Sequence, residues 1–143
     1  MSISRYNSEG YPDPTTYGAL SNIEQQTKAA RAYRPMVYVC SPFSGDVAGN
    51  IANARKYSRF AVEHGYIPIA PHLLFPQFLN DNDPVERELG MHFGNVLMSH
   101  CAEVWLFGES ISSGMDAEIR RAKRKKYRLR YFGSDLKEVS KDA

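Results

Sequence analysis

The stretch Val104–Phe107 (VWLF), followed by Ser110–Ala122 (SISSGMDAEIRRA), decides the fold of this chain. A short apolar run of this kind predicts a buried strand. Beyond it, Met115, Ile119 and Ala122 recur at helical spacing, so a helix should begin within a few residues of the strand. A strand that leads directly into an amphipathic helix is the repeating unit of an α/β domain.

The beginning of this helix carries residue types that suit a ligand site. Ser112 or Ser113 is the expected N-cap, and Gly114 lets the backbone approach a ligand. Glu118 lies near the helix start, where negative charge is favoured by about 0.3–1 kcal/mol. We therefore expect Glu118 to stay ionised, which suits a nucleophile or an electrostatic stabiliser. In the alternative interpretation the serines only cap the helix and Glu118 is a solvated acid.

The same patterns predict three more strands and two more helices. The expected strands are Met36–Cys40, Tyr66–Ala70 and Arg128–Phe132, and the expected long helices are about Val47–His64 and Pro84–His100. Pro68 favours an edge position for the second strand. This alternation predicts an α/β fold: a Rossmann-like or flavodoxin-like parallel sheet of four to five strands with helices on both faces. Ligands bind such sheets at the carboxyl ends of the strands.

Three regions divide the chain. Residues 1–35 are expected to form an extended arm and a helix from about Asp13 to Ala32, and residues 36–133 the α/β domain. Residues 134–143 are charged, so we expect a frayed tail. Within the domain, Pro71–Pro84 reads as a long non-repetitive loop, whose apolar residues indicate a pocket wall or a subunit contact.

Composition excludes several classes of protein. The net charge of +2 over 143 residues gives no argument for nucleic-acid binding. The basic run Arg120–Arg130 is expected to be a solvated helix end, with an anion or nucleic-acid patch as the alternative. Cys40 and Cys101 are expected to be buried free thiols, and they match no zinc pattern. With no metal, no cofactor, no signal peptide and no apolar run long enough to span a membrane, a cytoplasmic location is expected.

A second group of polar residues follows the first strand. The loop Ser41–Asp46 contains Ser41, Phe43, Ser44 and Gly45, and it should lie at the same edge of the sheet as the Ser112–Glu118 corner. A loop between strand and helix can bring backbone N–H groups to a phosphate or sugar. It matches neither GxGxxG nor a Walker A motif, and a plain connection is the alternative.

Residues Val37–Phe132 resemble the nucleoside 2-deoxyribosyltransferase-like superfamily, which includes 2′-deoxynucleoside 5′-phosphate N-hydrolases and phage and bacterial domains. The resemblance rests on VYVCSPFSG, on AEVWLFG and SSGMDAEIRRA, and on the basic helix. It implies that Glu118, in a Gly-x-x-x-Glu motif, is the nucleophile. It also implies substrate contacts from the first loop and from the Ser112–Glu118 corner. Together with two residues that we add from the segment Pro71–Pro84, His72 and Asp83, the expected substrate-binding residues are Ser41, Phe43, Ser44, Gly45, His72, Asp83, Ser112, Ser113, Gly114 and Met115.

One position departs from that superfamily. Its members carry an Asp that protonates or orients the leaving base, and by spacing this position is Asn95. An amide cannot donate that proton. Glu88 or His92 on the same helix is a possible substitute, as is Asp81 or Asp83 in the loop.

The expected function is therefore cleavage of a nucleoside or nucleotide N-glycosidic bond, or deoxyribosyl transfer. Glu118 is the expected nucleophile, and Asn95 and Glu88 are the further catalytic candidates. The alternative is a nucleotide-binding module, a sensor or a sequestering protein, that does not cleave. The expected partners are a small-molecule nucleoside or nucleotide and further copies of the chain in a homo-oligomer. A membrane partner is not expected, and nucleic acid is the weaker alternative.

Overall fold

The computed structural model describes residues 21–28 and 32–140. The chain divides into two units, Met1–Arg34 and Pro35–Ala143. In the first unit residues 21–28 are helical, within the helix expected from about Asp13 to Ala32. The rest of that expected helix and the expected arm lie outside the described residues.

The second unit is built on one five-stranded sheet. Its strands run in the order β2-β1-β3-β4-β5. The first four pair in parallel and the last pairs antiparallel with its neighbour. Their bounds are β1 Met36–Cys40, β2 Ile67–Ile69, β3 Glu103–Phe107, β4 Arg128–Phe132 and β5 Glu138–Val139. The predicted parallel sheet is therefore confirmed, and Pro68 does lie on an edge strand.

The three long helices lie at the predicted places, and two short helical pieces that were not predicted follow β2. Their bounds are α2 Val47–Glu63, α3 Pro71–Leu74, the 3₁₀ turn η1 Phe75–Gln77, α4 Pro84–Met98 and α5 Ser113–Arg124. Asp46, Asp83 and Ser112 cap α2, α4 and α5, each accepting a hydrogen bond from a backbone N–H of the first turn. Gly65, with φ +84°, follows the end of α2 as predicted.

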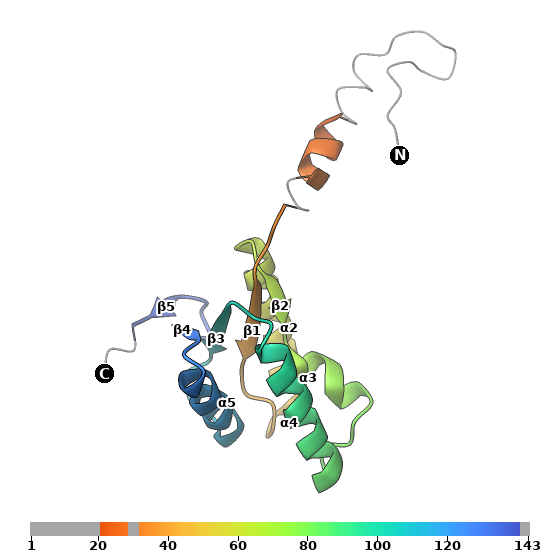
Figure 1. Cartoon of the computed structure of the whole chain (residues 1–143), viewed down its shortest axis with the longest axis vertical. Coiled ribbons are helices and arrows are strands. Elements are labelled where there is room, and N and C mark those ends of the chain that lie inside the picture. The colour runs from red at the N-terminus through yellow and green to blue at the C-terminus, as the bar shows by residue number, and fades with distance from the viewer. Residues whose placement is uncertain (1–20, 29–31, 141–143) are drawn as a thin grey trace. The chain divides into compact units, whose positions relative to one another are not determined.

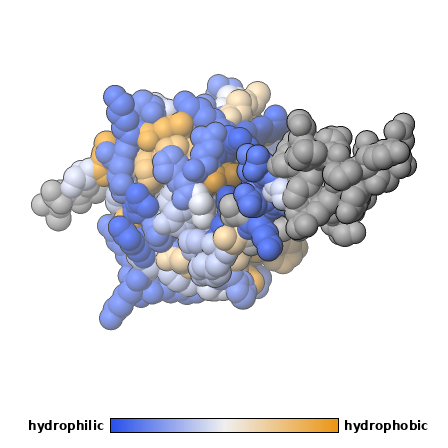
Figure 2. Space-filling model, turned by 90° about the horizontal axis from the view of Figure 1, so that it is seen from above, coloured by the Kyte–Doolittle hydropathy of each residue, from blue (hydrophilic) through white to orange (hydrophobic). Residues whose placement is uncertain are grey.

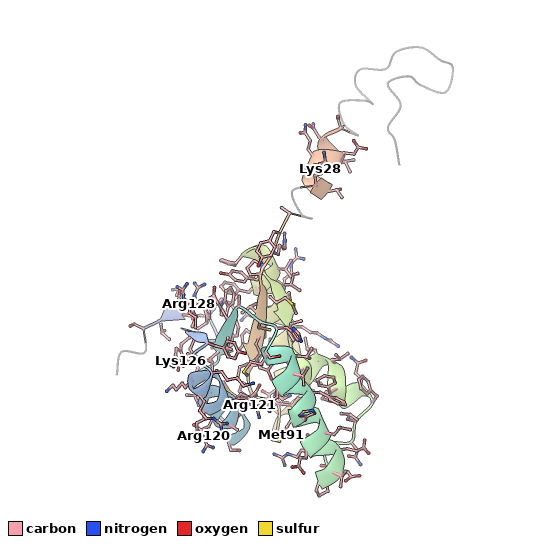
Figure 3. All side chains as sticks on the ribbon, in the orientation of Figure 1. Lys28, Met91, Arg120, Arg121, Lys126 and Arg128 are labelled. Atoms are coloured by element: carbon pink, nitrogen blue, oxygen red, sulfur yellow. The ribbon has the colours of Figure 1, made fainter. Side chains whose placement is uncertain are left out.

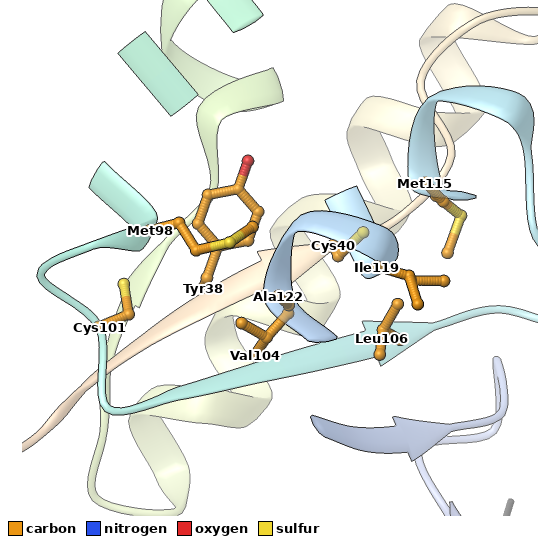
Figure 4. Close-up of a cluster of buried hydrophobic side chains, with 9 residues drawn as sticks. All are labelled: Tyr38, Cys40, Met98, Cys101, Val104, Leu106, Met115, Ile119 and Ala122. Atoms are coloured by element: carbon orange, nitrogen blue, oxygen red, sulfur yellow. The ribbon is translucent and has the colours of Figure 1, made fainter. Parts of the chain in front are cut away.

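The sheet is covered on both faces, because alternate residues of each strand point to opposite sides. On one face, Val37 and Val39 pack with Trp105, Phe107 and α2. On the other face, β1 and β3 side chains pack against α4 and α5, which lie on the same side of the sheet in Figure 1. Figure 4 shows this second core, formed by Tyr38, Cys40, Met98, Cys101, Val104, Leu106, Met115, Ile119 and Ala122.

The structure corrects two expectations. The segment Pro71–Pro84 is not a loop without regular structure, because α3 and η1 occupy its first half. Pro71 supplies the fixed φ that suits the first turn of a helix. The tail after Gly133 is not simply frayed, because β5 pairs with β4. The guanidinium of Arg130 also donates two hydrogen bonds, of 2.8 and 2.9 Å, to the carboxylate of Glu138.

The described surface is mostly hydrophilic on the face seen in Figure 2, with small separate hydrophobic areas. Val85, Leu89 and Val96 of α4 are large exposed hydrophobic residues. The homo-oligomer expected from the sequence stays a prediction. Among residues 21–28 and 32–140, no helix combines the length and the apolarity that crossing a bilayer requires.

Candidate functional site

A pocket of about 240 Å³ opens where the strand order reverses between β1 and β3. Its walls come from segments that follow three parallel strands: Phe43 and Ser44 after β1, Pro71 and His72 after β2, and Ser112 after β3. In open α/β sheets this switch point is where ligands bind, because the loops on either side of it diverge. The fold therefore places the pocket where a ligand is expected.

One stripe of α5 forms a wall of the pocket. Gly114, Ala117, Glu118 and Arg121 all line it, at the i, i+3, i+4, i+7 spacing that keeps side chains on one helix face. The adjacent stripe, with Met115 and Ile119, faces the sheet and is buried. Ile119 anchors α5 against the sheet, and Glu118, the residue before it, is thereby turned toward the pocket.

The opposite wall belongs to α4 and to the segment before it. Gly90 and Gly94 lie one turn apart and line the pocket, together with Met91. Glycine in a helix interior costs about 1 kcal/mol relative to alanine, so a glycine whose Cβ would meet a neighbour is explained by the space it leaves. A Cβ atom on Gly94 would lie 3.1 Å from the hydroxyl oxygen of Tyr38. Gly94 therefore makes room for that hydroxyl.

Glu118 has a mostly buried side chain, with 13% exposed. Burial raises the pKa of its carboxyl, while hydrogen bonds from the Tyr38 hydroxyl and the Cys40 thiol, and the charge of Arg121, lower it; the net direction is upward. Burial and the same carboxylate raise the pKa values of Tyr38 and Cys40 well above their ordinary values. Both groups therefore remain protonated donors to Glu118.

His72 faces Glu118 across the pocket. Its Nε2 atom lies 3.8 Å from Oε1 of Glu118, beyond hydrogen-bond distance. Burial lowers the pKa of His72, opposed by the charge of Asp81, so the ring is neutral near pH 7. The ring also stacks on Phe43, with 5.0 Å between centroids and 17° between planes. His72 is therefore held as a flat, neutral surface at the pocket.

The first loop is tied to α2. The side-chain amide of Asn50 donates to the carbonyl oxygens of Phe43 and Ser44, at 2.9 and 3.0 Å. Gly45 adopts φ +93°, which only glycine tolerates without strain, and it completes the turn into α2. The loop that carries Phe43 is thus fixed from behind and presents its side chains to the pocket.

Replacing Glu118 with Gln should stabilise the fold near neutral pH. Because the folded pKa of Glu118 is raised, the folded state binds more protons than the unfolded state just above the ordinary carboxyl pKa of 4.5, and stability falls as pH rises through that window. The amide of the glutamine carries no charge, so the variant avoids this loss. We expect thermal melting to show a higher Tm for E118Q than for wild type at pH 7, with the difference shrinking toward pH 4. A pH-independent difference would contradict the burial argument.

Two glycine-to-alanine substitutions in α4 should show whether each glycine is needed for space at the site. Alanine favours the helix at both positions, but only at Gly94 does its Cβ come close to a neighbour. Gly90→Ala should raise the free energy of unfolding by up to about 1 kcal/mol, because its Cβ meets only Leu79 at 3.5 Å. Gly94→Ala should gain less or lose stability, because it displaces the Tyr38 hydroxyl that donates to Glu118. Urea unfolding measures both. Equal gains from the two variants would show that Gly94 makes no room for Tyr38.

The structure brings together most of the residues singled out from the sequence. Eight line the pocket: Phe43, Ser44, His72, Ser112, Ser113, Gly114, Met115 and Glu118. Ser112 is confirmed as the N-cap, with its Oγ 3.2 Å from the backbone N of Met115. Glu118 lies beyond the first turn of α5, where the helix dipole has little effect. The expectation that the helix start keeps Glu118 ionised is therefore corrected, because burial is the largest influence on its pKa and raises it.

The other five site residues predicted from the sequence do not line this pocket. Ser41 is buried, Gly45 shapes the first loop, and Asp83 caps α4 by accepting from the N–H of Val85. Glu88 is exposed on α4, and Asn95 lines a separate groove between α4 and α5. The helix spacing that placed Glu88 and Asn95 on one face is sound, but the opposite side of α4, with Gly90 and Gly94, faces the pocket.

Sequence reasoning missed several pocket residues. Tyr38, Arg121, Glu86 and Arg87 also line the pocket, and so does Asp81, which the sequence had offered only as a possible substitute acid. The signal for Arg121 was its spacing of three from Glu118, which places both on one helix face. The signal for Tyr38 was strand alternation with Cys40, which puts both on the face that α5 covers. No short-range pattern marks Glu86 as a pocket residue or favours Asp81 over Asp83, because both Asp81 and Glu86 approach the pocket through tertiary packing.

The fold and the pocket together define a doubly wound α/β domain with a pocket at its topological switch point. No curated protein matches this sequence. The chain belongs to the family described as a domain of unknown function (DUF7768), whose model matches residues 35–132. That match covers the whole parallel sheet and every pocket-lining segment.

Proposed function

We propose that this protein cleaves the N-glycosidic bond of a nucleoside or nucleotide, or transfers its deoxyribosyl group, as in the nucleoside 2-deoxyribosyltransferase-like superfamily. The observation that carries the proposal is Glu118, a mostly buried carboxyl that lines a pocket at the switch point of the sheet together with hydroxyls, glycines and aromatic rings. A pocket of about 240 Å³ has the scale of a sugar with part of its base.

The chemistry assigns a role to each wall. A carboxylate oxygen of Glu118 attacks C1′ and forms a C1′–O bond as the C1′–N bond breaks. The electron pair of the C1′–N bond leaves with the base, which takes up a proton. Tyr38 and Cys40 orient the carboxylate by donating to it. Water or a second base then displaces Glu118 from C1′, giving hydrolysis or transfer.

The proton for the departing base must come from another group at the pocket. Asn95 and Glu88 do not line it, whereas Asp81 and Glu86 do. We assign this role to one of these two carboxyls, which approach from the wall opposite α5. Phe43, stacked on His72, offers an apolar face on which a base can lie.

The test is incubation with a panel of deoxynucleosides and deoxynucleoside 5′-phosphates, followed by chromatography for free base. We expect release from at least one of them. A second added base separates transfer from hydrolysis, because transfer yields a new nucleoside. Absence of free base and of exchanged nucleoside across the panel would contradict the proposal.

A second candidate function is nucleotide binding without cleavage. The observation that favours it is that Asn95, an amide at the position of the superfamily's acid, does not line the pocket. Calorimetry followed by chromatography distinguishes the two. A nucleotide that binds and is recovered intact across the pH range from about 5 to about 9, which lies above the ordinary carboxyl pKa and spans the titration of imidazole, supports the binding module.

A further inference from the structure

A second cavity, the α4–α5 groove, lies beside the pocket and is not used by the proposed reaction. It is lined from α5 by Arg121, Arg124 and Lys125, and from α4 and its C-terminal end mainly by His92, Asn95 and Ser99. Arg121 lines both the groove and the pocket, so the two are neighbours. Figure 3 labels Arg121 on the part of α5 that faces α4.

The groove is strongly positive. Its lining contains three cationic side chains and no carboxylate. In the described part of the chain, no acid lies within ion-pair distance of Arg124 or Lys125, whereas Arg120 pairs with Asp116 at 3.1 Å. The helix dipole favours cations at this end of α5, but it does not require them to line a cavity. The arrangement therefore leaves two cations free to bind an anion.

Asn95 adds a polar group in need of a partner. Its Oδ1 atom is buried and has no hydrogen-bond donor among the described residues. This atom is closed to a water-sized group, so only the remaining atoms of the Asn95 side chain can contact an anion in the groove.

The position of the groove indicates which anion it suits. Arg124 is six residues beyond Glu118 in α5, which at 1.5 Å per residue is about 9 Å along the helix axis. Arg121 lies halfway between them. An anionic chain that starts at the pocket and follows α5 would therefore meet Arg121 first and then Arg124 and Lys125.

We propose that the α4–α5 groove is a polyphosphate subsite, which binds the distal phosphates of a nucleoside di- or triphosphate whose sugar lies at Glu118. The choice of substrate rests on the proposed function, while the anion site itself rests only on the groove. The same phosphate chemistry can come from free inorganic polyphosphate, and the two sources are separable by experiment.

Isothermal titration calorimetry tests this with inorganic tripolyphosphate, a deoxynucleoside triphosphate and the parent nucleoside. Glu118→Gln serves as the background, so that no nucleotide is consumed. The groove variant is Arg124→Gln with Lys125→Gln. The matched control is Arg120→Gln with Lys123→Gln, which removes the same charges from the same helix outside the groove. Circular dichroism confirms that each variant is folded.

We expect the groove variant to bind tripolyphosphate and the triphosphate at least about 10-fold more weakly, with nucleoside affinity within about twofold of the background. The control should stay within about twofold for all three ligands. Arg124→Lys, which keeps the charge, should retain most of the affinity.

Equal losses in the groove variant and the control would reduce the effect to net charge and overturn the subsite. Absence of tripolyphosphate binding to the background protein would also overturn it. A loss for tripolyphosphate with unchanged nucleotide affinity would assign the groove to a free anion and overturn the substrate assignment. None of these results depends on base release, so failure of the proposed function is recognised separately.

Discussion

The variant E118Q is expected to release free base at least roughly 10³-fold more slowly than wild type, with ligand affinity changed by no more than about threefold. The glutamine keeps the shape and the hydrogen-bonding reach of the side chain, but it cannot attack C1′. Removing a nucleophile typically costs orders of magnitude in kcat and little in binding, which single-turnover kinetics with calorimetry separate.

Asp116→Asn is the matched control for this substitution. Asp116 is an exposed acid two residues away on the same helix, and it pairs with Arg120 outside the pocket. Its loss should leave the rate within about twofold of wild type, because surface ion pairs contribute little. Equal rates in E118Q and wild type would remove Glu118 from the reaction, and equal losses in both variants would point to a general effect on the fold.

The ionisation of Glu118 also sets the direction in which the rate of base release changes with pH. Attack needs the ionised carboxylate, and burial raises its pKa. The acid limb of kcat should therefore lie at higher pH than the ordinary value for a glutamate, and activity should fall as pH drops through the raised pKa. The acid limb of kcat/KM reports this pKa in the free enzyme, which is the pKa that governs the stability difference between wild type and E118Q.

Phe107→Ala is expected to destabilise the domain by about 3–5 kcal/mol. The ring is 1% exposed. It stacks between Tyr57 at 4.4 Å and Phe132 at 5.0 Å, so it joins α2 to β3 and β4. Truncation removes both ring contacts and leaves a cavity that rigid neighbours cannot fill. Because small domains are stable by about 5–15 kcal/mol, urea unfolding should show a large shift of the midpoint.

Phe78→Ala provides the contrast. Phe78 is 63% exposed and touches Phe75 edge-on at 6.1 Å, so its loss should change the free energy of unfolding by no more than about 0.5 kcal/mol. Phe75 lines the pocket and Phe78 does not, although the aromatic residues of this segment were expected to form a pocket wall. A comparable cost for the two truncations would mean that the aromatic core does not dominate stability.

The sequence by itself determined the α/β class, the four parallel strands and the helix starts of this protein. Strand and helix periodicity is local, and so is capping. The apolar run at Val104–Phe107 and the hydroxyl of Ser112 therefore specify β3 and the start of α5 without long-range information. Because the carboxyl ends of parallel strands share one edge, the sequence also placed the first loop and Glu118 near each other.

Only the tertiary structure decided which face of α4 meets the pocket and which groups surround Glu118. Asn95 and Glu88 share a helix face in the sequence, yet the packing of Gly94 against Tyr38 turns the opposite face inward. The raised pKa of Glu118 likewise depends on burial beneath side chains distant in sequence, Tyr38 and Cys40 among them. Desolvation is a sum over neighbours in space, so no local pattern can report it.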